Sequence, residues 1–241
     1  AIDRTVAEGG MNLLRGGSHL LEDGIRHQAE MPVAGADKFR VGREVAVTPG
    51  KVILRNELIE LIQYAPTTAT VRPEPILLVP AWIMKYYILD LSPHNSLVRF
   101  LRDQGHTVYC ISWKNPTDRD ADRGMDDYLR DRIFAALDAI GRIQPERRVH
   151  ATGYCLGGTL LSIAAAAMAR DGDDRLASVS LFTAQVDFSE PGEIGLFIDE
   201  AQVHMLEAQM GRSGCFSADQ MAGAFQMLRS YDLLWSRAIH E

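Results

Sequence analysis

Short apolar runs alternate with amphipathic stretches through the middle of the chain. Residues 76–79 (Ile-Leu-Leu-Val) are continuously apolar, which is typical of a strand that is buried on both faces. Residues 126–143 instead carry apolar side chains at helical spacing. The whole pattern predicts strands at 76–79, 106–112, 148–153 and 177–184, in turn with helices at 96–104, 126–143 and 158–170. This alternation favours an α/β fold with a mostly parallel sheet and helices on both faces. Asn95 is expected to cap the helix 96–104, which Gly105 ends.

The regions on either side of this core follow other patterns. Before it, Val45–Val47, Lys51–Arg55 and Leu58–Tyr64 predict two strands and a third short strand or helix. Near the amino end we expect a short, charged surface or interaction helix around residues 11–26. After Asp187 the strands stop, and residues 198–210 and 218–239 are expected to be helical. We therefore divide the chain into an amino-terminal helical segment (1–38), a partial α/β core (39–187) and a partial helical region (188–241).

Composition excludes several classes of protein. The 241 residues have a formal net charge of −7, which does not suit a protein that neutralises nucleic-acid phosphates. No apolar stretch is long enough for a transmembrane segment. The three cysteines, at 110, 155 and 215, form no CxxC pair, so we expect neither a disulfide framework nor a bound metal, and a reducing, cytoplasmic setting. We find no signal peptide, and the start at Ala1 is expected of a fragment or a processed chain.

One motif between a predicted strand and helix can carry chemistry. Gly153-Tyr-Cys-Leu-Gly157 matches the nucleophile elbow G-x-Nuc-x-G, with Cys155 in the nucleophile position. Such a sharp turn exposes the side chain at the strand end, and the N–H of Leu156 can donate to an oxyanion. The alternatives are a buried cysteine in a glycine-rich turn and a phosphate-binding loop. The motif lacks the lysine of a Walker loop and the glycine spacing of a dinucleotide loop.

A second oxyanion donor in such folds comes from the loop after an earlier strand, which corresponds here to residues 80–85. The general base is harder to place. After Cys155 only His204 and His240 remain, and neither lies where a base is expected. Asp187 follows the last strand, where an acid can stand, although a capping role is as well supported. We therefore expect the base to lie outside these 241 residues.

Several stretches together carry a resemblance to a known family. Beside the elbow segment 153–160, they are residues 48–58, 60–68, 79–91, 104–108, 111–116 and 228–236. These stretches span nearly the whole chain and follow one another in the family's order. They make the sequence resemble the polyhydroxyalkanoate synthases of the PhaC family. The resemblance implies an α/β-hydrolase core followed by a helical cap. In the family an asparagine is common at the position of Met84.

The resemblance also implies a reaction. The family's acyltransferases polymerise 3-hydroxyacyl-CoA and release CoA through a covalent cysteine intermediate. Cys155 then corresponds to the nucleophile, and the backbone N–H groups of Leu156 and Ile83 to the oxyanion donors. The family's catalytic Asp and His lie downstream of the Trp235 region, so this chain alone is expected to be inactive. No cofactor is expected, because the CoA thioester is the substrate.

Partners and location follow from the same resemblance. The partners would be the growing polyester chain, the granule surface and a second copy of the chain in a homodimer. The location would be the cytoplasm, on polyhydroxyalkanoate granules. Two alternatives stay open at this point: a cysteine hydrolase like dienelactone hydrolase, and a non-catalytic truncated homologue that binds granules.

Overall fold

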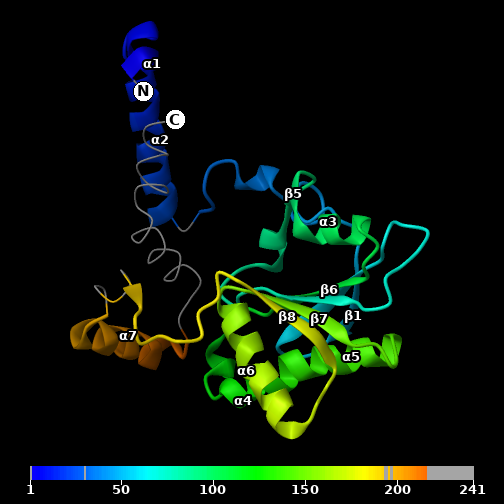
Figure 1. Cartoon of the computed structure of the whole chain (residues 1–241). Coiled ribbons are helices and arrows are strands. Elements are labelled where there is room, and N and C mark those ends of the chain that lie inside the picture. Colours follow the sequence, from blue (N-terminus) through cyan, green and yellow to red (C-terminus); the bar gives the residue numbers. More distant parts are fainter. Residues whose placement is uncertain (1, 30, 193–194, 196–197, 216–241) are drawn as a thin grey trace. The chain divides into compact units, whose positions relative to one another are not determined.

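A six-stranded, mostly parallel sheet forms the centre of the α/β part of the chain (Figure 1). The computed structural model describes residues 2–29, 31–192, 195 and 198–215. The strands are β1 (Lys51–Arg55), β2 (Ile59–Tyr64), β3 (Ile76–Val79), β6 (Val108–Trp113), β7 (Val149–Tyr154) and β8 (Leu176–Phe182). They lie in the order β1-β2-β6-β3-β7-β8. β1 and β2 pair antiparallel with each other, as do β2 and β6, and the remaining pairs are parallel.

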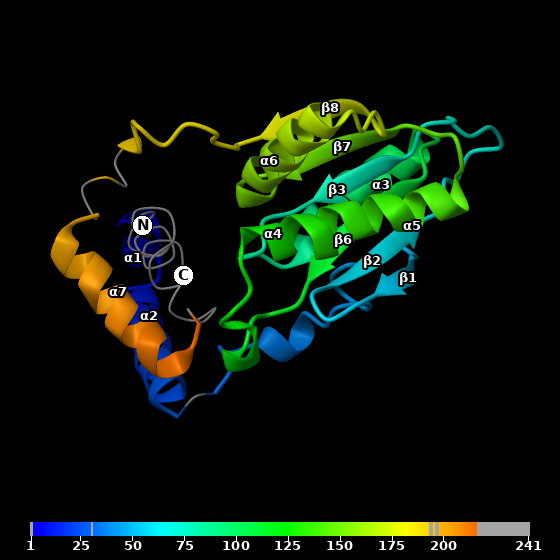
Figure 2. The same cartoon turned by 90° about the horizontal axis from the view of Figure 1, so that it is seen from below.

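Helices cover both faces of this sheet (Figure 2). One face carries α3 (Leu97–Asp103), and the other carries α5 (Ala135–Ile143) and α6 (Leu156–Asp171). Two shorter segments, α4 (Met125–Tyr128) and the π-helix η4 (Leu129–Phe134), lead directly into α5. The remaining small elements are the hairpin strands β4 (Asp90–Ser92) and β5 (Asn95–Ser96) and the 3-10 turns η2 (Tyr86–Leu89) and η3 (Asp118–Asp120).

The alternation of side chains along each strand builds two separate cores. Leu77 and Val79 of β3 point to the face covered by α5 and α6, where a large cluster includes Ile133, Leu137 and Leu160. Ile76 and Leu78 point to the opposite face, where a smaller cluster forms around Val98 of α3. All four β3 side chains are therefore buried, which explains why this strand is continuously apolar in sequence.

The described chain divides by its contacts into two units, residues 2–44 and residues 45–215. The first holds α1 (Ile2–Ala7), α2 (Met11–Gln28) and the 3-10 turn η1 (Ala36–Lys38). The second holds the sheet with its helices and α7 (Glu200–Ser213). The domain boundaries at 38/39 and 187/188 stay predictions, as does the helical nature of residues 218–239, which lie outside the described residues. Within the described part of the chain, no helix is long and apolar enough to cross a membrane.

The predicted α/β architecture is confirmed. Counted along the chain, the sheet strands lie in the order 1-2-4-3-5-6, and a sharp turn joins the fifth strand to its helix; both features are typical of the α/β-hydrolase fold. The strands and helices predicted for residues 76–184 are all present, with ends shifted by a few residues. The helix expected around residues 11–26 is present as α2.

Several local predictions were wrong. Residues 45–47 form no strand. The cap of α3 is Ser96 and not Asn95, because the Ser96 hydroxyl accepts a hydrogen bond from the Arg99 N–H at 2.9 Å. The predicted helix 126–143 is interrupted by the π-helix, a change of winding that the apolar spacing does not reveal.

A buried carboxylate ties the segment before β1 to the hairpin and α3. Asp90 is 1% exposed and accepts hydrogen bonds from the hydroxyls of Thr48 and Ser96, each at 2.6 Å. The Thr48 N–H also donates to Asp90, at 3.3 Å. Because Asp90 and Thr48 are buried and Ser96 is partly buried, the carboxylate and the hydroxyls depend on one another.

We expect Asp90→Ala to lower the free energy of unfolding by about 2–4 kcal/mol, since it leaves two hydroxyls without their acceptor. Urea unfolding measures this difference. The matched control is Asp122→Ala, which removes an exposed carboxylate and should change stability by less than about 0.5 kcal/mol. Equal losses in the two variants would contradict the structural role of Asp90.

Candidate active site

Cys155 lies in the sharp turn between β7 and α6, in a backbone conformation that is unusual for a residue with a side chain. Its φ is 53° and its ψ −130°, whereas non-glycine residues rarely adopt positive φ. Three hydrogen bonds hold this conformation. The Cys155 N–H donates to Phe182 O of β8 at 2.9 Å, and its carbonyl accepts from the N–H groups of Gly158 and Thr159 at 2.8 and 3.2 Å. The side chain is half-buried.

The three glycines around Cys155 are required by close backbone packing. A Cβ at Gly157 would lie 2.2 Å from the carbonyl oxygen of Val79 in β3. A Cβ at Gly153 would lie 2.3 Å from the Cα of Gly158, and one at Gly158 would meet Ala184 at 2.5 Å. The Gly-x-Cys-x-Gly-Gly pattern therefore lets α6 begin directly against β3 and β7.

Both predicted oxyanion donors lie at the same edge of the sheet as Cys155. Leu156 is the first residue of α6, so its N–H has no acceptor inside the helix. Ile83 lies in the loop after β3, in a turn closed by the Met84 N–H to Ala81 O at 3.0 Å. β3 is the direct parallel neighbour of β7, with Val79 opposite Gly153. Among the described residues, no hydrogen bond uses the N–H of Leu156 or Ile83.

The side chain of Trp113 holds the loop after β3 in place. The indole Nε1–H of Trp113, at the end of β6, donates to Pro80 O at 2.6 Å in a buried position. The same Pro80 oxygen lies close to the first turn of α6, since a Cβ at Gly157 would approach it to 2.5 Å. Pro80 is thus fixed between β6 and α6, two positions before Trp82. A second link, from Lys85 Nζ to Asn115 Oδ1 at 2.6 Å, ties the loop to the segment after β6.

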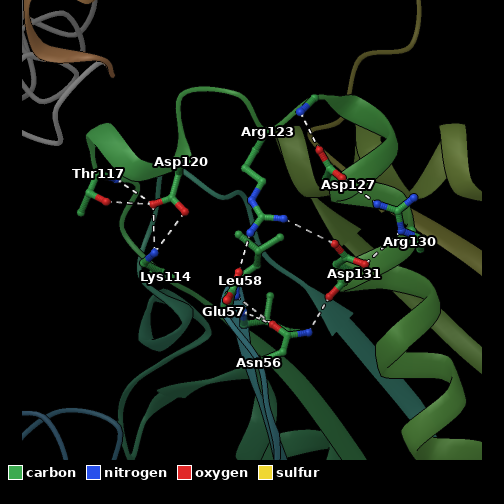
Figure 3. A network of polar contacts seen from close by, with 12 residues as sticks. Asn56, Glu57, Leu58, Lys114, Thr117, Asp120, Arg123, Asp127, Arg130 and Asp131 are labelled. Atoms are coloured by element: carbon green, nitrogen blue, oxygen red, sulfur yellow. Dashed lines mark hydrogen bonds and ion pairs between the residues drawn. The ribbon is translucent and has the colours of Figure 1, made fainter.

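A polar network anchors the loop after β6 (Figure 3). Lys114 Nζ donates to both carboxylate oxygens of Asp120, and the Thr117 N–H donates to the same group at 2.9 Å. The Lys114 ammonium and the Thr117 N–H together hold the pKa of Asp120 down to about 2. Arg123 forms an ion pair with Glu57 in the turn between β1 and β2. Sequence patterns did not predict this network, because its members are brought together only by the fold.

None of the described histidines forms a hydrogen bond with Cys155. His150 lies in β7, five residues before Cys155 and roughly 16 Å away along the strand, where it contacts Ser178 Oγ at 2.7 Å. His204 pairs with Glu207 on the exposed face of α7, at 3.3 Å. Within the described part of the chain, no hydrogen bond joins any histidine to Cys155; His240 and the Trp235 region lie outside the described residues.

Asp187, the candidate acid after the last strand, caps a turn. Its carboxylate accepts from the Ser189 N–H at 2.9 Å, and these hydrogen bonds with Ser189 lower its pKa. Of the residues that the structure describes, no three His, Cys, Asp or Glu side chains are grouped in a way that could hold a metal ion.

Comparison with known proteins shows what this chain is similar to. Residues 1–101 match the family model described as "Poly-beta-hydroxybutyrate polymerase (PhaC) N-terminus". The poly(3-hydroxyalkanoate) polymerase of Methylorubrum extorquens is 46% identical over 98% of this chain. The corresponding PhaC subunit of Rhizobium meliloti is 43% identical over 96% of the chain. The matched regions are 40% and 38% of those two relatives, so the chain spans about two fifths of their length.

The chain belongs to the PhaC family. The resemblance based on the motifs is thereby confirmed. Among solved structures, the Francisella virulence factor BioJ matches with a TM-score of 0.46 and 18% identity, over 65% of this chain and 50% of that one. The α/β hydrolase LAE6 from the metagenome of Lake Arreo matches with a TM-score of 0.45 and 18% identity, over 64% of this chain and 49% of its own.

We expect Gly157→Ala to lower the free energy of unfolding by about 1–3 kcal/mol or more, because the added methyl group meets the backbone of β3. Urea unfolding again measures the change. Gly141→Ala in α5 is the matched control, since its Cβ would meet nothing within 4 Å. The control should raise stability by about 0.5–1 kcal/mol, as alanine favours helix. A neutral Gly157→Ala variant would contradict the close packing of the elbow.

Proposed function

We propose that the protein carrying this chain is an acyltransferase that polymerises 3-hydroxyacyl groups from CoA thioesters, with Cys155 as its nucleophile. The observation that supports this most directly is the elbow: Cys155 stands at the carboxyl end of β7 with positive φ, at the start of α6. The names of the similar proteins, which are poly(3-hydroxyalkanoate) polymerases, support the substrate and product classes.

In the first step the Cys155 thiolate attacks the carbonyl carbon of the acyl-CoA thioester. A bond forms between Sγ and that carbon, and the carbonyl oxygen becomes an oxyanion. The N–H groups of Leu156 and Ile83 are proposed to stabilise this charge, in the way that oxyanion holes do. The bond to the CoA sulfur then breaks, and CoA leaves as a thiolate that takes up a proton.

In the second step a hydroxyl group attacks the acyl-Cys155 thioester. An ester bond forms, the Sγ–carbon bond breaks, and Cys155 returns to its thiolate form. A cysteine suits this sequence, because exchange between two thioesters is nearly balanced in free energy. A serine would form a more stable ester, which would hold the acyl group less ready for transfer.

The hydroxyl proton must pass to a general base. We propose that this base is a histidine oriented by an aspartate, both outside these 241 residues, since no described histidine hydrogen-bonds with Cys155. The 241-residue chain alone would then not turn over the thioester substrate. We further propose that the reaction needs no cofactor besides the thioester substrate.

The remaining proposals concern partners and location. We propose that the protein acts as a homodimer, binds its growing polyester chain and resides in the cytoplasm at the surface of polyester granules. The similarity of this chain to poly(3-hydroxyalkanoate) polymerases supports these proposals.

We expect Cys155→Ala, in the full polypeptide that carries this sequence, to reduce CoA release from 3-hydroxybutyryl-CoA by at least about 10³-fold and to abolish polymer formation. The reason is the loss of the sulfur that accepts the acyl group. Thiol-specific colorimetry measures CoA, and mass spectrometry of the wild type should find the acyl group on Cys155.

Cys215→Ala serves as the control, since it also removes a half-buried thiol but outside the elbow, and it should keep wild-type activity. Polymerisation by Cys155→Ala would refute the assignment of the nucleophile. Steady CoA release by the 241-residue chain alone would refute an external base, and cleavage of a lactone in place of polymerisation would favour the cysteine hydrolase.

A further inference from the structure

Arg132 is a buried cation that contacts the aromatic side chains next to the loop of Ile83. It belongs to the π-helix η4 and is only 5% exposed. Its Cζ atom lies 3.0 Å from the ring centroid of Tyr128 and 5.2 Å from that of Trp113. Within the described residues, no ion pair joins Arg132 to a carboxylate, and its Nε has no hydrogen-bond partner.

Burying such a group is unfavourable. Burial lowers the pKa of Arg132 to about 10, although the neighbouring Tyr128 and Asp120 oppose this shift. The guanidinium therefore remains protonated at neutral pH, stabilised by the faces of the two rings and by the nearby carboxylate of Asp120. An apolar side chain of similar size would fill the same space without a desolvation cost. Stability alone thus gives no reason for a cation at this position.

The rings that Arg132 contacts are those that hold the loop of Ile83. Trp113 donates its Nε1–H to Pro80 O at 2.6 Å, and Trp82 packs edge-on against Tyr128 with 5.6 Å between the centroids. Pro80 and Trp82 lie on either side of Ala81, which is fully buried and accepts the hydrogen bond that closes the turn around Ile83. The orientation of the Ile83 N–H therefore depends on both rings.

The local winding of the helix supports a special role for this position. The Ala135 N–H donates to the carbonyl of Arg130, five residues earlier, as in a π-helix. π-helical turns are rare and occur frequently at functional sites. Here the turn carries Arg132 and directly follows Tyr128.

We propose that Arg132 is a positioning residue for oxyanion stabilisation: by holding Tyr128 and Trp113 it sets the orientation of the Ile83 N–H. This inference rests on the proposed function of Cys155. It assigns Arg132 no contact with the substrate, since its effect passes through Trp113, Pro80 and Trp82.

The test compares two reactions of the same sulfur in the full polypeptide that carries this sequence. Acylation of Cys155 by 3-hydroxybutyryl-CoA passes through an oxyanion, whereas alkylation by iodoacetamide does not. The variants are Arg132→Met, which removes the cation, and Trp113→Phe, which keeps a ring but removes the donor to Pro80. The control is Arg142→Met, an exposed arginine on α5.

We expect Arg132→Met and Trp113→Phe each to slow acylation about 10- to 100-fold while alkylation changes less than about twofold. The double variant should be no slower than the slower single variant, because both changes release the same loop. Arg132→Lys keeps the charge but lacks the flat guanidinium, so its acylation rate should lie between those of the wild type and Arg132→Met. Arg142→Met should leave both rates unchanged.

Three results would overturn the proposal or separate it from the proposed function. Wild-type acylation by Arg132→Met would overturn it, and equal slowing of alkylation and acylation would show that Arg132 only maintains the elbow. If the wild-type Cys155 is alkylated but never acylated, the proposed function fails instead. In that case, amide hydrogen exchange of residues 81–84 tests whether Arg132 positions the loop. Faster exchange in Arg132→Met than in Arg142→Met supports the positioning role, and equal exchange rates overturn it.

Discussion

The first turn of α6 comes so close to the ends of β3 and β7 that no side chain fits between them. The carbonyl oxygens of Val79 and Pro80 occupy the space where a Cβ of Gly157 would stand, and Gly153 touches Gly158. This contact between backbones sets where the helix starts and forces Cys155 into positive φ. Strain of this kind persists only when the surrounding structure determines it, as the hydrogen bond from Cys155 to Phe182 does here.

The same contact brings together loops that are distant in sequence. Because β6, β3, β7 and β8 run parallel, their following loops meet at one edge of the sheet. Pro80 stands at the centre of that edge, with α6 on one side and the Trp113 indole on the other. Thr159 in the first turn of α6 donates to Gln185 O at 2.7 Å and so holds the loop after β8 as well. The chain that carries this arrangement belongs to the PhaC family.

Much of the fold and the elbow could be predicted because their signals are local. The apolar run of β3, the helical spacing after Asp126 and the Gly-x-Cys-x-Gly-Gly motif each lie within a short stretch of chain. The predictions were wrong where a tertiary hydrogen bond competed with the local pattern. Ser96 caps α3 in place of Asn95, because its hydroxyl also meets the buried Asp90. Residues 45–47 form no strand, since Ala46 and Thr48 bond to Asp90 instead of a sheet.

By itself, the sequence determined the alternation of strands and helices and the place of Cys155 between them, because hydrophobic spacing and glycine positions act over a few residues. Only the tertiary structure decided what surrounds the cysteine. Trp113, Tyr128 and Arg132 are separated from Ile83 by 30 to 49 positions, and no short-range pattern links them. They meet because the sheet places β6 beside β3, and because η4 packs through Ile133 on the sheet face that carries Leu77 and Val79. The buried cation beside the rings is a consequence of that packing.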